Sequence, residues 1–240
     1  MRKISRSAVE QHLKCQKCFY LNYNHKIRPH TLPFTLNSAV DNLCKNEFDH
    51  YRAKAEPHPM FLEHGIDAVP FAHEKMDEWR NNFKGIRHIN EEAGYNFGGA
   101  VDDIWEKPNG DLIVIDVKST SKNVFDWEDT YSKWEYAKGY RRQLEMYQWL
   151  LEKNGFTVAS EGYLVYYNGK KHEPMFNQQL TFDLHLVKLE CDNSWVEEAV
   201  LNAKATLDGD MPKSSQSCEN CNYLKERWKV SQKDPSKLIE

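Results

Sequence analysis

Apolar side chains recur at helical spacing in the first third of the chain. Residues 1–23 show this spacing, which predicts an N-terminal helix with Ser5 or Ser7 as its N-cap. A second helix is predicted over residues 36–54, and a short third one over residues 73–83. The chain is therefore expected to begin with helices.

The pattern changes to that of strands after residue 95. Residues 95–118 are predicted to form two strands joined by a turn at 108–111, because LIVIDV is a nearly continuous apolar, β-branched run. The polar stretch 119–134 is too long for a tight connection and is therefore expected to have a functional role. The remaining predictions are a helix over 136–154 closed by Asn154-Gly155, strands over 157–167 and 180–189, a helix over 195–207, and a cysteine-bearing tail. This order predicts an α/β fold with a mixed sheet flanked by helices.

Composition narrows the class of protein. With 240 residues and 40% hydrophobic content, we expect a single domain over residues 1–240 with a sizeable core. The net charge of -4 excludes a uniformly basic binder, yet residues 1–30 carry seven Lys/Arg against one Asp/Glu. That basic N-terminal helix is expected to face phosphate. Because no apolar run approaches a membrane span or a signal-peptide core, we expect a cytoplasmic protein with no membrane partner.

The candidate chemistry lies in the predicted hairpin. Asp116 and Lys118 are two residues apart in a strand, so both side chains project from the same face. If residues 108–110 form a three-residue loop, Asp102 lies opposite Asp116 on that face, with Cβ atoms about 4.5–5.5 Å apart. A two-residue loop would place Asp103 there instead. Either register brings two carboxylates together beside a lysine.

Two close carboxylates repel one another, and a bound divalent cation relieves that repulsion. Oxygen ligands that leave room for water suit Mg²⁺ or Mn²⁺ better than zinc. Such a metal lowers the pKa of bound water, and Lys118 would orient that water or neutralise the reacting phosphate. This indicates metal-assisted phosphodiester hydrolysis. The alternative is a surface Asp–Lys ion pair on an edge strand.

Three short motifs then follow in order: Gly99-x-x-Asp102, Asp116-Val117-Lys118 and Gln143-x-x-x-Tyr147. Their order, spacing and element types resemble the PD-(D/E)XK nuclease superfamily. More narrowly, they resemble its RecB-type branch, which includes helicase-linked nucleases and CRISPR-adaptation exonucleases. The resemblance implies a restriction-endonuclease-like core, with its catalytic part at residues 95–155. It also implies a DNA nuclease working with a helicase or with a repair or phage-defence partner, and the catalytic set Asp102, Asp116, Lys118, Gln143 and Tyr147.

Gln143 and Tyr147 are four residues apart and share one face of the predicted helix. The resemblance implies that this face meets the active site, whereas the alternative is that Tyr147 packs in the core and Gln143 is incidental. The same helix carries three cations that would either hold DNA phosphates or form a solvated face: Lys138, Arg141 and Arg142.

The family usually adds a helix histidine as a further metal ligand, in the pattern G-x-x-x-H. Here the comparable stretch runs from Asn37 to Asp41, so Asp41 stands where the histidine is expected. An aspartate can bind the same hard cation, and Asp41 is the third candidate metal ligand. The alternative is an exposed helix residue. The missing histidine also leaves open a different function, a nucleic-acid-binding module without catalytic activity.

Two CxxC pairs stand near opposite ends of the chain: Cys15, Cys18, Cys218 and Cys221. If the termini meet, they form a Cys₄ set fit for Zn²⁺ or an iron–sulfur cluster such as 4Fe–4S, clamping residues 1–30 to residues 210–230. Iron–sulfur members of the resembled family supply one cysteine from the N-terminus and three from the C-terminus. The last one is absent near Arg227, so Cys18 would replace it. The alternative is four unliganded thiols.

Overall fold

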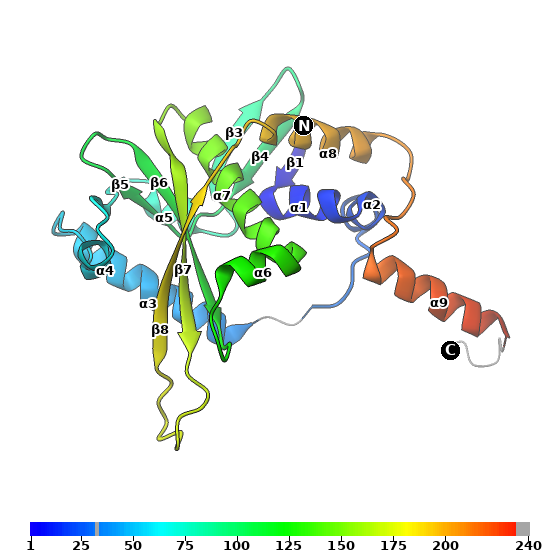
Figure 1. Cartoon of the computed structure of the whole chain (residues 1–240). Helices are drawn as coiled ribbons and strands as arrows, with labels where there is room; N and C mark the ends of the chain where they lie inside the picture. The colour runs from blue at the N-terminus through cyan, green and yellow to red at the C-terminus, as the bar shows by residue number, and fades with distance from the viewer. Residues whose placement is uncertain (32–33, 234–240) are drawn as a thin grey trace.

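The computed structural model describes residues 1–31 and 34–233, and these form two β-sheets and a set of helices (Figure 1). The strands are β1 (Arg2–Ser5), β2 (Val69–Pro70), β3 (Ile86–Asn90), β4 (Tyr95–Gly99), β5 (Asp103–Glu106), β6 (Leu112–Thr120), β7 (Val158–Gly169) and β8 (Phe182–Glu190). The helices are α1 (Arg6–Lys14), α2 (Gln16–His25), α3 (Thr35–Arg52), α4 (Pro59–Glu63), α5 (Met76–Arg80), α6 (Trp127–Lys133), α7 (Glu135–Lys153), α8 (Val196–Asp208) and α9 (Glu219–Lys233).

The larger sheet has five strands in the order β2-β5-β6-β7-β8. Its central strands β6 and β7 are parallel, and the other neighbours are antiparallel. The smaller sheet has the order β1-β4-β3, with β1 parallel to β4. The predicted α/β class with a mixed sheet flanked by helices is therefore confirmed.

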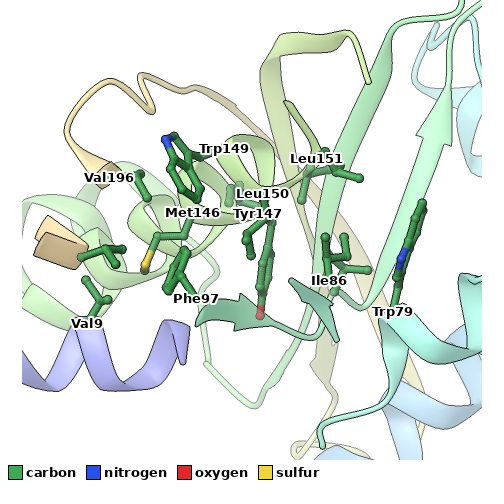
Figure 2. Packing of buried hydrophobic residues seen from close by; sticks show 14 of the residues in the cluster. Val9, Trp79, Ile86, Phe97, Met146, Tyr147, Trp149, Leu150, Leu151 and Val196 are labelled. Atoms are coloured by element: carbon green, nitrogen blue, oxygen red, sulfur yellow. The ribbon is translucent and has the colours of Figure 1, made fainter. Parts of the chain in front are cut away.

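Helices cover both faces of the larger sheet. On one face, Leu144 of α7 packs with Leu112 and Val114 of β6, and Figure 2 shows part of this core around α7. On the other face, Phe48 of α3 packs with Ile113. Because both faces of β6 are buried, its sequence is a continuous apolar run rather than an alternating one. Charged side chains within such a strand need partners.

The N-terminal prediction of one continuous helix was wrong. Residues 2–5 instead pair with β4 as a short strand, and Ser5 is the N-cap of α1, its hydroxyl accepting a hydrogen bond from the Ala8 N–H. At Cys15 the backbone is extended (φ -162°), which separates α1 from α2. The interruption places Cys15 at the start of α2, so that the side chains of Cys15 and Cys18 can both reach the same site.

The prediction of two strands over residues 95–118 was also wrong, because residues 100–102 leave the sheet. β4 therefore belongs to the smaller sheet and β5 to the larger one. The predicted three-residue-loop register is confirmed within the hairpin, where Asp103 pairs with Ile115 and Glu106 with Leu112.

The polar stretch 119–134 is not irregular throughout. It contains α6, whose N-cap Asp126 accepts a hydrogen bond from the Asp129 N–H. The sequence patterns also did not predict four further elements, β2, β3, α4 and α9, which are short or carry a mainly polar surface. The predicted end of the long helix at Asn154-Gly155 is confirmed, with Gly155 at φ +90°.

Within residues 1–31 and 34–233, the helices are too short or too polar for any of them to span a lipid bilayer.

Candidate active site

Strand β6 carries the two charged residues that define the site. Asp116 and Lys118 lie on the face that packs toward α7, and the Asp116 side chain is almost completely buried. The Lys118 ammonium forms an ion pair with Asp116 and also lies 4.5 Å from the centre of the Tyr140 ring on α7. Because Asp116 is buried, Lys118 is only partly exposed and β6 is the central strand of its sheet, the alternative of a surface ion pair on an edge strand is wrong.

Asp102 lies where the chain enters β5. Its Oδ2 atom accepts a hydrogen bond of 2.8 Å from the Val117 N–H, which holds the carboxylate against β6. Asp103, the next residue, projects to the opposite face of the sheet and forms ion pairs with Arg52 and Arg80. The register thus selects Asp102, rather than Asp103, as the neighbour of Asp116.

Asp41 comes to the same place from α3. Its Oδ2 atom lies 2.7 Å from the Lys45 ammonium, which is also 3.7 Å from Asp102 Oδ1. Asp41 is partly buried, so the alternative of an exposed helix residue is wrong. Burial raises the pKa of Asp41, and the neighbouring Asp102 charge raises it further.

Asp116 is the most deeply buried of the three carboxylates. Burial raises the pKa of Asp116 to about 7, and although Lys118 lowers it, the Asp102 charge adds to the increase. Lys118 shows the converse effect. Burial opposes its charge, but Asp116 and Asp102 together raise the pKa of the ammonium. The site therefore holds its negative charge at an energetic cost.

The QxxxY motif lies beside these carboxylates, as the resemblance implied. The Gln143 amide donates hydrogen bonds to Asp116 Oδ1 at 2.6 Å and to the Tyr147 hydroxyl at 3.1 Å. Tyr147 is also a core residue, and Figure 2 shows its ring extending from α7 between Phe97 and Ile86. The two interpretations of Tyr147 therefore both hold: its ring packs in the core and its hydroxyl joins the site.

Gly99, the glycine of the first motif, leaves room for the Tyr147 ring because it has no side chain. A Cβ atom at this position would lie 2.7 Å from Tyr147 Cε1, which is too close for any side chain. The G-x-x-D and Q-x-x-x-Y motifs are thus linked by packing, since one glycine lets the Tyr147 ring approach the end of β4.

The three cations predicted to hold phosphates are paired within the protein. Lys138 and Arg142 both contact Glu135, and Arg142 also binds the Glu10 carboxylate through two nitrogen atoms. Arg141 binds Glu145 on its own helix. Phosphate binding by Lys138, Arg141 and Arg142 stays a prediction, and binding would have to compete with these ion pairs.

Two further cations at the site were not singled out by the motif search. Lys45 joins Asp41 to Asp102, and Arg6 of α1 lies close to Tyr147 and Asp116. Burial opposes the charge of Arg6, but Tyr147 and the Asp116 carboxylate raise the pKa of its guanidinium. The excess of Lys/Arg in residues 1–30 was the signal that pointed to this segment. For Lys45 the signal was its position four residues after Asp41.

The donor set fits a hard divalent cation. Two carboxylate oxygens, Asp41 Oδ1 and Asp116 Oδ2, are buried without a hydrogen bond to the described part of the chain, although the second faces the Lys118 ammonium. Carboxylate oxygens of this kind are the ligands that Mg²⁺ and Mn²⁺ prefer. Asp41, Asp102 and Asp116 would hold such a cation, but oxygen atoms of the three carboxylates do not all lie within 4.8 Å of one another among the described residues. Binding would therefore require these side chains to move closer together and Lys45 to give way.

The cysteine pairs meet in a second site. The sulfur atoms of the two pairs all lie within 4.8 Å of one another: Cys15, Cys18, Cys218 and Cys221. Within residues 1–31 and 34–233, no other group of three or more Cys, His, Asp or Glu side chains brings its ligand atoms this close together. Figure 1 shows α1 and α2 beside the segment that leads into α9. The cluster therefore joins the N- and C-terminal segments, as predicted, and can hold a metal.

The electrostatics of the cysteine site favour a thiolate. Burial opposes ionisation of Cys15, but hydrogen bonds from the backbone of Cys18 and Ser215 lower the pKa of its thiol to about 7. A thiolate is the form in which cysteine binds metals. Burial raises the pKa of the Cys18 thiol, and its contacts with Cys221, Cys218 and Cys15 raise it further.

Comparisons with known proteins found matches among solved structures and one family model. The solved structures include an alkaline exonuclease from Laribacter hongkongensis, with 14% identity, a TM-score of 0.40, and coverage of 99% of this chain and 95% of that chain. They also include a phage-related exonuclease from Haemophilus somnus (13%, TM-score 0.40, 85% and 79%) and a putative exonuclease from Eubacterium rectale (12%, TM-score 0.44, 92% and 87%). No curated protein sequence matches the chain. The model of the PD-(D/E)XK nuclease superfamily matches residues 35–225, most of the chain, and this protein therefore belongs to that superfamily.

Proposed function

We propose that this protein is a Mg²⁺- or Mn²⁺-dependent nuclease that hydrolyses phosphodiester bonds in DNA. The observation that carries the proposal is the convergence of Asp102, Asp116 and Lys118, with Gln143 bonded to Asp116. A cation held there would lower the pKa of a bound water and stabilise charge on a phosphate oxygen.

The chain's own residues have separate tasks in this proposal. Asp102 and Asp116 bind the cation, with Asp41 as a third ligand. Lys118 orients the attacking water and neutralises charge on the reacting phosphate, because its ammonium stays protonated beside Asp116. Gln143 fixes the Asp116 carboxylate through its 2.6 Å hydrogen bond, and Tyr147 holds Gln143 in turn.

We further propose that the chain is a single nuclease domain of the RecB-type branch, acting in the cytoplasm with a helicase or with a repair or phage-defence partner. The order of its three motifs supports this assignment, together with the cysteine pairs that flank the catalytic part. The cysteine site would hold Zn²⁺ or a 4Fe–4S cluster, because both accept four thiolate ligands.

The test of the proposed function is a cleavage assay on the full chain. Labelled single- and double-stranded DNA, and RNA of the same sequence, are incubated with the protein and Mn²⁺ or Mg²⁺, with EDTA in a parallel reaction. We expect DNA products that EDTA suppresses, and their lengths separate release of end nucleotides from internal cuts. If DNA binds in a salt-dependent manner but no products form with either metal, the protein is the catalytically inactive binding module instead.

Loss of the cysteine-bound metal is expected to lower the thermal stability of the protein. Cys15 and Cys221 are 206 residues apart, and a link that closes so long a loop contributes about 5 kcal/mol in the chain-entropy model. For a chain of this length, that corresponds to a fall in Tm of about 10–20 °C. We therefore expect Cys218→Ser to lower Tm by this amount and to release the metal.

The measurement is thermal unfolding combined with metal analysis and visible absorbance of protein purified without oxygen. A coloured protein contains an iron–sulfur cluster, whereas a colourless protein with one equivalent of zinc contains Zn²⁺. Cys191→Ser is the matched control, because Cys191 lies outside the cluster. A metal-free preparation with an unchanged Tm in Cys218→Ser would show that the thiols are unliganded.

A further inference from the structure

A pocket of about 170 Å³ opens directly beside the candidate catalytic residues. Asp102, Gln143 and Tyr147 line one side of it, and most of the other lining groups are polar. Three cations complete the lining: Arg6 from α1, Lys84 from the loop before β3, and Arg87 from β3 itself. Segments from distant parts of the sequence thus bring three positive charges to one hollow.

These cations differ from the other basic side chains around the site, because none of the three forms an ion pair with a described residue. Arg87 donates only to uncharged oxygen atoms, at 3.3 Å to the Asn96 side chain and at 3.4 Å to the Phe83 carbonyl. In contrast, Arg142 and Lys45 nearby are both held by carboxylates. Arg6 lies near the Asp116 charge, and Asp102 lines the same pocket, but Lys84 and Arg87 have no ion-pair partner among the described residues. The pocket therefore offers cationic groups that are not held in ion pairs.

The loop that carries Lys84 is fixed by its own hydrogen bonds. The Asn81 side-chain oxygen accepts from the backbone N–H groups of Phe83 and Lys84. Gly85 follows at φ +65°, where a Cβ atom would lie 2.4 Å from the Gly99 carbonyl oxygen, so the loop lies directly against the end of β4. Its conformation is therefore tied to the strand that precedes Asp102.

The same loop holds Phe83 in solvent at the edge of the site. Phe83 is 91% exposed and lines a second hollow, which also contains Asp41 and Lys45. Asn82 lines both hollows, so the loop lies between them. An aromatic ring in this position has both faces available for stacking.

We propose that the pocket formed by Arg6, Lys84 and Arg87 binds an internal phosphate next to the cleaved bond, and that Phe83 stacks on an unpaired base of the same strand. This inference rests on the proposed function, because it takes the neighbouring carboxylates as the place of cleavage. Unpaired cations provide charge complementarity for a phosphate, and an exposed aromatic ring provides a stacking surface for a base.

The exposed ring of Phe83 indicates that the nucleic acid bound here is a single strand. In a duplex the faces of the bases are covered by their neighbours, so an isolated ring has no base face to contact except at an end. The phosphate pocket alone would serve either form of DNA. Because Phe83 and the pocket residue Lys84 lie on the same loop, one strand can contact both, and an unpaired strand is therefore the preferred substrate.

The test measures binding in EDTA, where no cleavage takes place. The probe is a fluorescein-labelled oligothymidine without terminal phosphates, so that all its phosphates are internal, and a blunt hairpin duplex serves for comparison. We expect Phe83→Ala to weaken single-strand binding roughly five- to 150-fold, the range for one stacked base, and to leave duplex binding unchanged. Phe83→Trp should restore it. Lys84→Ala and Arg87→Ala should weaken binding to both probes, each reducing the salt dependence of single-strand affinity by about 0.7 in logarithmic slope.

Two controls match these changes elsewhere on the surface. Leu62→Ala removes another exposed apolar side chain, and Lys229→Ala removes an exposed lysine of α9. Neither is expected to alter binding.

Unchanged affinity in the Phe83, Lys84 and Arg87 variants would overturn the inference, as would an equal loss of duplex and single-strand binding in Phe83→Ala. If wild type cleaves DNA while these variants bind normally, the inference alone fails. If the variants weaken binding but wild type never cleaves, the proposed function fails and the subsite stands.

Discussion

Asp116→Asn is expected to reduce metal-dependent DNA cleavage by at least about a thousandfold, equivalent to about 4 kcal/mol of transition-state stabilisation. The change removes the charge that would bind the cation but keeps a side-chain oxygen that can accept the hydrogen bond from Gln143. The geometry around the site should therefore persist. Cleavage rates measured over a range of Mn²⁺ concentrations test this expectation.

The same variant should not lose stability above neutral pH. Because burial raises the pKa of Asp116 from 3.8 to about 7, the folded state keeps a proton that the unfolded state releases near pH 3.8. This group therefore contributes less to the free energy of unfolding as pH rises from about 4 through 7. The amide of the Asp116→Asn variant would not titrate, so the stability of the variant relative to wild type should rise across that window in metal-free buffer.

The matched control is Asp183→Asn, the same chemical change on the outer strand β8, where the side chain is about half exposed. Its cleavage rate should equal that of wild type. Cleavage by Asp116→Asn at the wild-type rate would rule out Asp116 as a metal ligand.

Asp103→Ala is expected to lower the free energy of unfolding by about 3–5 kcal/mol, the usual cost of breaking a buried ion pair. Asp103 is completely buried, and both Arg52 and Arg80 form ion pairs with it. Without it, only the half-exposed Asp49 would remain to pair with both guanidinium groups, and burial together with the Arg80 charge already lowers the pKa of Arg52. Chemical denaturation of the metal-free protein measures the loss.

The neighbouring residue provides a sharp comparison. Asp102→Asn should abolish cleavage with little change in stability, whereas Asp103→Ala should cleave normally per folded molecule but unfold more easily. Adjacent aspartates thus have opposite predicted roles, because they project to opposite faces of the sheet. If Asp102→Asn were the less stable variant and Asp103→Ala the inactive one, the roles assigned from the register would be reversed.

Local patterns predicted the elements whose signals are strong. The long helix α7 and the buried strand β6 lie within a few residues of their predicted bounds, because helical spacing and a β-branched apolar run are both distinctive. The failures occurred where long-range pairing determined the structure. Residues 2–5 form a strand only because β4 is available beside them, and residues 100–102 leave the sheet as the chain passes from one sheet to the other.

The candidate site also combines features that local sequence patterns predicted with features that only long-range packing determined. Hairpin geometry left two registers open, with Asp102 or Asp103 beside Asp116, and the structure has the register of the three-residue loop. The spacing of Gln143 and Tyr147 placed both on one face of a helix. No local pattern revealed that Arg6 would line the same pocket, because almost the whole of the first hundred residues separates it from Asp102.

The sequence by itself determined the mixed α/β class, the meeting of an aspartate with Asp116 beside Lys118, and the motif order of the nuclease superfamily. These depend on spacing along one strand or one helix, which the backbone geometry fixes. Only the tertiary structure decided which charges neutralise one another. Packing joined Lys45 to two carboxylates, paired Arg142 with Glu10, and brought the terminal cysteines together, while leaving Arg6, Lys84 and Arg87 without an acidic partner among the described residues. Ion pairs and metal ligands depend on distances between segments remote in sequence, and those distances are set by how the elements pack.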